Sequence, residues 1–275
     1  MLGKLLKYDF RSMLKQFALV WPAALVLGLI NRFTMQHVIT SSTLAGEIVS
    51  GSAMLVYVFI LIGMFILSVI FMIQRFYKGL LRDEGYLMHT LPVRPWQLIT
   101  AKLLCAMTVV IISFLVAVLS GLLIFPLEWQ DYLGAFRAFW DSVRAVSQFY
   151  LGQTILVFVE FLLFLLLSVA SRFLQMYQSM AIGHLFGKNR ILMSVVAFMA
   201  IDTAMGVISS LMGVGVFSTG LLDKVANSVT VADSASAIFG VMHGVLWIGI
   251  GYAAVWTAVF FLGTNYILKR KLNLE

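Results

Sequence analysis

The sequence predicts an all-α membrane protein with six transmembrane helices, and three observations support this fold class. Of the 275 residues, 61% are hydrophobic and only 11% are charged, and the mean hydropathy is +0.99. Apolar runs recur that are long enough to cross a bilayer, which takes about 20 residues. Lys and Arg gather between these runs on one predicted side, as the positive-inside rule requires. This composition excludes an ordinary soluble domain.

The first 16 residues predict an amphipathic helix in the cytoplasmic interface. Basic residues recur at intervals of three and four: Lys4, Lys7, Arg11 and Lys15. Leucines, Phe10 and Met13 occupy another face, so the basic stripe would lie against lipid phosphates. We therefore expect membrane lipid as a partner of this segment.

Six spans follow from the apolar runs. They cover about residues 17–36, 52–73, 97–125, 149–173, 191–212 and 240–268. Residues 127–148 place aromatic and charged residues on different faces, which predicts an amphipathic helix on the outer surface. Residues 213–239 are rich in Gly, Ser, Thr and Val, and predict a re-entrant or surface-lying pair of short helices.

The distribution of basic residues sets the orientation. Six spans put both termini on one side, and the segments assigned to the cytosol carry 15 of the 19 Lys and Arg, against 4 outside. The cytosolic segments include residues 74–97 and 174–190. We therefore expect a multi-pass protein of the plasma membrane with both ends in the cytosol.

The first cytoplasmic segment, residues 74–97, is predicted to hold a short helix lying across the membrane face. Proline disfavours the α conformation in the residue before it, so this helix should end at Leu91-Pro92. Asp83, Glu84 and Gly85 precede an apolar patch on this helix, and the exposed Tyr86, Leu87 and Met88 of that patch would form a docking surface.

Two acidic residues fall near the middle of predicted spans, Glu160 and Asp202. A charge at a helix centre costs about 2.5–3.5 kcal/mol, so such a residue either lines a polar pathway or is bonded to neighbours and fixes packing. Both interpretations stay open. We expect no intramembrane Lys or Arg to be available as a partner for either carboxylate.

Several chemistries find no support in the sequence. The one cysteine, Cys105, excludes an internal disulfide and a cysteine-based metal site. The His, Asp and Glu residues form no metal-ligand spacing. Residues 183–189 differ from a phosphate-binding loop, with three residues between the glycines and Asn189 where Ser or Thr would hold magnesium. We expect no enzymatic activity, no bound cofactor in this chain, and no nucleic-acid partner.

The chain resembles the permease subunit of type-2 ATP-binding-cassette (ABC-2) exporters of firmicute-type bacteria. The residues that carry the resemblance are MLGKLLKYDFRSM at the start, FYKGLLRDEGYLMHTLPVRPWQLITAKLL (76–104) and AIGHLFGKNRILMS (181–194). The resemblance implies that residues 83–88, ending at Leu91-Pro92, form the coupling helix that contacts a separate cytoplasmic ATPase, which binds ATP and Mg²⁺. It implies a smaller contact around Gly183, His184 and Leu185, and a second permease copy or a similar chain as partner.

The function expected from the residues and the resemblance together is ATP-driven export of a hydrophobic or amphipathic substrate, such as a lipid, peptide or drug. Two alternatives stay open: a proton-coupled secondary transporter that uses Glu160 and Asp202, and a non-transporting membrane sensor or immunity protein.

Overall fold

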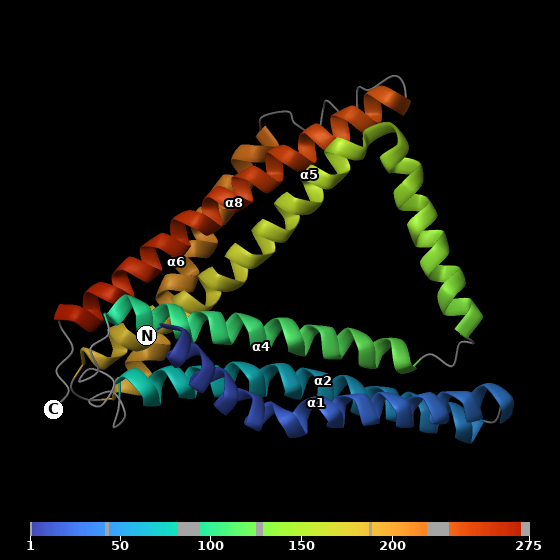
Figure 1. Cartoon of the computed structure of the whole chain (residues 1–275), viewed down its shortest axis with the longest axis horizontal. Helices are drawn as coiled ribbons and strands as arrows, with labels where there is room; N and C mark the ends of the chain where they lie inside the picture. Colours follow the sequence, from blue (N-terminus) through green and yellow to red (C-terminus); the bar gives the residue numbers. More distant parts are fainter. Residues whose placement is uncertain are drawn as a thin grey trace. The chain divides into compact units, whose positions relative to one another are not determined.

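The computed structural model describes residues 2–41, 44–81, 94–124, 129–186, 189–218 and 231–270. Their regular secondary structure is entirely helical (Figure 1). In chain order the helices are α1 (Leu2–Ser41), α2 (Leu44–Phe76), the π-helix η1 (Tyr77–Leu81), α4 (Pro95–Ile124), α5 (Trp129–His184), α6 (Arg190–Ser218) and α8 (Val231–Arg270). The predicted all-α class is confirmed.

Six of the described helices contain stretches long and apolar enough to cross a membrane, as predicted. They are Leu5–Gln36, Gly51–Gly79, Pro95–Ile124, Tyr150–His184, Arg190–Gly215 and Ser236–Lys269. Their lengths of 26 to 35 residues correspond to about 39–52 Å at 1.5 Å per residue, against a hydrocarbon core of roughly 30 Å. The helices are therefore longer than an untilted crossing requires, and they extend beyond the limits of the predicted spans.

Local sequence explains where two of these helices begin. Pro95 opens α4, where a missing N–H and a fixed φ are tolerated. The Gln97 side chain accepts a hydrogen bond from the Arg94 backbone N–H at 3.1 Å, which caps the helix start. Before α6, Asn189 adopts a positive φ of 58°, a conformation that Asn enters more readily than most residues. That residue lets the chain reverse between α5 and α6.

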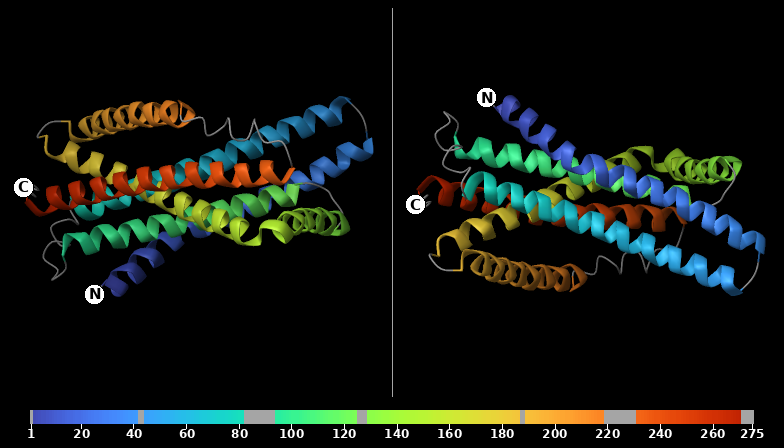
Figure 2. Two further views of the ribbon diagram at one scale, coloured as in Figure 1. Left: turned by 90° about the horizontal axis from the view of Figure 1, so that it is seen from above. Right: turned by 90° about the horizontal axis from the view of Figure 1, so that it is seen from below.

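The chain divides into two compact units, Met1–Ala138 and Phe139–Glu275. In the first unit α1 and α4 run parallel and α2 runs antiparallel to both. Trp21 Nε1 of α1 donates to Ser113 Oγ of α4 at 3.0 Å. At Gly28 the two backbones are so close that an added Cβ would lie 2.8 Å from a backbone oxygen of α4. Figure 2 shows α1 as one unbroken helix, and the interfacial position of its first 16 residues stays a prediction.

In the second unit the long part of α5 runs parallel to α8, with α6 antiparallel to both. The Tyr252 hydroxyl of α8 donates to the Met205 carbonyl of α6 at 2.8 Å. Helix α5 bends at Tyr150, whose φ of −137° and ψ of 36° are not helical, and Figure 1 shows the bend. The helix predicted at 127–148 thus corresponds to the part of α5 before this bend. The described parts of 213–239 are the end of α6 and the start of α8.

Candidate functional site

The predicted coupling surface cannot be placed. Residues 82–93 lie outside the described residues, and they contain all eight residues assigned to the first ATPase contact: Asp83, Glu84, Gly85, Tyr86, Leu87, Met88, Leu91 and Pro92. The described residues do place the other predicted site residues and reveal three clusters of polar side chains within or at the ends of the spans.

The second predicted contact lies at the reversal between α5 and α6. Gly183 is buried, and an added Cβ there would overlap Ser194 of α6. His184 is 8% exposed, and its Nε2 lies 3.3 Å from Arg190 Nη1. Leu185 and its neighbour Phe186 are 43% and 45% exposed. Gly183 and His184 therefore build the turn. Among the described residues of this reversal, Leu185 and Phe186 are exposed apolar residues that another protein can contact, and Phe186 was not predicted.

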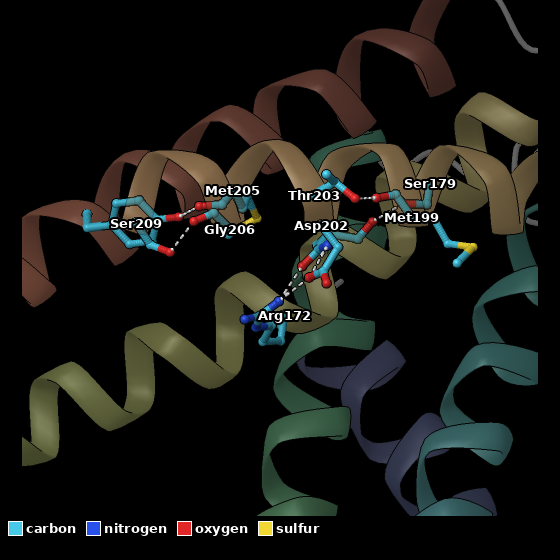
Figure 3. Close-up of polar contacts among 10 residues, drawn as sticks. Arg172, Ser179, Met199, Asp202, Thr203, Met205, Gly206 and Ser209 are labelled. Carbon is cyan, nitrogen blue, oxygen red and sulfur yellow. Dashed lines mark hydrogen bonds and ion pairs between the residues drawn. The ribbon is translucent and has the colours of Figure 1, made fainter. Parts of the chain in front are cut away.

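Asp202 on α6 has a basic partner, so the prediction that no Lys or Arg within a span is available was wrong. Arg172 Nη1 donates to Asp202 Oδ1 at 2.7 Å (Figure 3). Gln175 Nε2 of α5 donates to the same oxygen at 3.3 Å. The sequence placed the end of the fourth span at about Phe173, so Arg172 lay at its edge and was counted with the cytoplasmic charges. The helix continues to His184.

The Arg172–Asp202 pair is exposed, unlike a packing ion pair. The two side chains are 60% and 49% exposed, although they belong to helices that otherwise present apolar residues. Asp202 begins a stripe of polar and small residues along one side of α6, visible in part in Figure 3. We call it the α6 polar stripe: Asp202, Thr203, Gly206, Ser209, Ser210 and Gly213.

The hydroxyl groups of the α6 polar stripe donate within their own helix. Thr203 Oγ1 donates to the Met199 carbonyl at 2.8 Å, and the two serines donate to the Gly206 carbonyl at 2.9 and 2.8 Å. Their oxygen lone pairs can still accept hydrogen bonds from water or from a passing molecule. The stripe therefore has the chemistry of a hydrated surface.

Glu160 on α5 bonds to two residues of α8. Its Oε2 lies 2.7 Å from His243 Nδ1, and its Oε1 accepts from Trp247 Nε1 at 2.9 Å. The Glu160 side chain is 12% exposed, so the carboxylate is largely enclosed. The sequence predicted bonding to neighbouring residues as one interpretation of Glu160, and it did not identify His243 or Trp247 as those neighbours. The described residues contain no group of three or more His, Cys, Asp or Glu that could hold a metal ion.

The third cluster joins helices α1, α2 and α4 of the first unit. Asp9 Oδ1 of α1 accepts from Arg75 Nη2 of α2 at 2.6 Å and from Lys102 Nζ of α4 at 3.3 Å. Arg75 Nη1 also donates to Ser12 Oγ at 2.8 Å. We call Asp9, Arg75 and Lys102 the Asp9 triad. Sequence reasoning counted its two cations as cytoplasmic charges and did not consider Asp9.

Comparison with protein-family models, with curated proteins and with solved structures finds no match to this chain. The structure itself defines a multi-pass, all-α membrane protein with three polar clusters, and its function has to be argued from those clusters and from the sequence motifs.

Proposed function

We propose that this chain is the permease subunit of an ATP-driven ABC exporter, with ATP hydrolysis in a separate cytoplasmic ATPase and both termini in the cytosol of a bacterium. The observation that carries the proposal is the resemblance of residues 76–104 and 181–194 to the coupling segments of ABC-2 permeases. In a chain whose six spans cross the membrane in turn, these two segments connect spans on the same side. One cytoplasmic partner can therefore contact both.

The α6 polar stripe supports a transport function. An Arg or Asp in the hydrocarbon core costs about 2.5–3.5 kcal/mol, so charged residues within spans face water, a cavity or another protein surface. The exposed Arg172–Asp202 pair and the hydroxyl groups beyond it suit a pathway for a molecule with a polar end. Apolar side chains on the neighbouring faces suit its hydrophobic part. An amphipathic lipid, peptide or drug has both features.

Co-purification with the ABC ATPase encoded beside the gene tests the proposal. The wild-type chain should retain the ATPase and change its turnover. The Tyr86→Ala/Leu87→Ala variant should lose the ATPase while the permease stays folded. Leu185→Ala/Phe186→Ala should weaken binding less, because it removes only the smaller contact. A folded wild-type chain that neither retains the ATPase nor alters its turnover would refute the assignment.

The Glu160–His243 pair favours a second candidate, a proton-coupled secondary transporter. Glu and His side chains within spans form the proton relays of many pumps and transporters. Transporters of that kind commonly use helices broken near the bilayer midplane, whereas the described parts of the six spans are continuous between their ends. Transport that stops with an uncoupler and continues after ATP depletion would favour this candidate over the exporter.

A further inference from the structure

The Asp9 triad lies at the base of the segment that carries the predicted coupling helix. Arg75 is in the last turn of α2, directly before η1, and Lys102 lies two turns into α4. The chain between α2 and α4 therefore leaves from one cation of the triad and returns near the other. A single carboxylate oxygen, on Asp9 of α1, contacts both cations.

Burial makes the triad a strong link between the three helices. The side chains of Asp9 and Lys102 are 9% and 5% exposed, and that of Arg75 is 23% exposed. In such surroundings a charge interaction is much stronger than in water, and removing one partner leaves the other charge buried and uncompensated. Without the carboxylate, two cations would face each other at the same place.

We propose that Asp9 is a positioning residue of the coupling machinery: it ties the two helices that carry the coupling segment to the N-terminal part of α1. A movement of the segment imposed by the ATPase would then displace the ends of α1, α2 and α4 together. This inference rests on the proposed function. It adds a residue outside the two resembling coupling segments and gives α1 a role in transmission.

Other contacts of the first unit join the same helices away from the triad. Trp21 of α1 bonds to Ser113 of α4, and Tyr57 of α2 lies 2.7 Å from Ser120 of α4, hydroxyl to hydroxyl. These contacts lie farther along the helices than the triad. They hold the three helices together when the triad is broken, so the loss of the triad should mainly loosen the ends near the coupling segment.

The experiment compares ATPase turnover in the reconstituted permease–ATPase complex with turnover of the isolated ATPase. Asp9→Asn should still co-purify with the ATPase, and the effect of the permease on turnover should fall at least fivefold. Asp9→Glu, which keeps the carboxylate, should recover at least half of the wild-type effect. Lys102→Met is a second variant, because it leaves Asp9 and Arg75 as a balanced pair and removes the ion pair between Asp9 and α4. It should also lose most of the effect.

Trp21→Phe is the matched control, because it breaks a bond between the same two helices, α1 and α4, away from the coupling segment. It should lower the unfolding temperature and leave the effect on turnover within twofold of wild type. If it reduces the effect as much as Asp9→Asn does, the triad only stabilises the fold and the inference is wrong. If folded Asp9→Asn and Lys102→Met complexes keep the wild-type effect, the inference is also wrong, while the proposed function stands. If the wild-type chain binds no ATPase, the proposed function itself fails.

Discussion

The bonds of Glu160 to α8 lead to a quantitative prediction about how α5 and α8 associate. Replacing Glu160 by Met keeps the length of the side chain and removes the acceptor for Trp247 Nε1 and for His243 Nδ1. Hydrogen bonds between membrane helices contribute about 0.6 kcal/mol on average and at most about 1.7. Both bonds are short, so we expect Glu160→Met to destabilise the protein by about 1–3 kcal/mol.

A double-mutant cycle with Trp247→Phe isolates one of these bonds, because the indole N–H acts only as a donor. We expect a coupling energy of about 1 kcal/mol, a factor of about five in the unfolding equilibrium. Unfolding in mixed micelles with increasing SDS measures it. Thr203→Val is the control: its hydroxyl bonds within α6, so the change should stay within about 0.5 kcal/mol. A coupling energy near zero would refute the idea that this carboxylate joins the two helices.

Three further predictions concern close approaches and the exposed ion pair. Gly28→Ala should lower the free energy of unfolding by about 1–3 kcal/mol, because the new Cβ lies 2.8 Å from a backbone oxygen of α4. Gly63→Ala is the control in the same unfolding assay: nothing lies within 4 Å of its new Cβ, so it should be neutral or stabilising. Gly183→Ala should force α5 and α6 apart at the reversal and destabilise the protein at least as much as Gly28→Ala does. Limited proteolysis measures this: cleavage at the reversal should be faster than in the wild type. Asp202→Asn should change the free energy of unfolding by less than about 1 kcal/mol, since an exposed ion pair with Arg172 contributes little. The same variant should lower transport. Unchanged transport would exclude this pair from the pathway.

The six spans could be predicted because hydrophobicity alone decides which segments enter a bilayer. Their ends could not, because a helix continues past the last apolar residue wherever its polar residues find partners. In α5 the Ser179 hydroxyl donates to the Gln175 carbonyl one turn earlier at 2.7 Å, and both residues are buried. A hydropathy pattern interprets such residues as the start of a loop. The predicted span therefore ended at about residue 173, Arg172 was counted with the cytoplasmic cations, and its pairing with Asp202 was missed.

The partners of charged residues depend on how helices align, and alignment is not encoded in the periodicity of any one helix. Asp9 and Lys102 are 93 residues apart, and Glu160 and His243 are 83 apart. The sequence does show isolated acidic residues. Asp9 is the one acidic residue among the basic residues before the first span, and Glu160 is the one acidic residue in the fourth span. Because an uncompensated charge is costly in a membrane, each such acid implies a partner on another helix. Applied to Asp9, that rule would have pointed to the basic residues that flank the coupling segment, which include Arg75, Arg94 and Lys102.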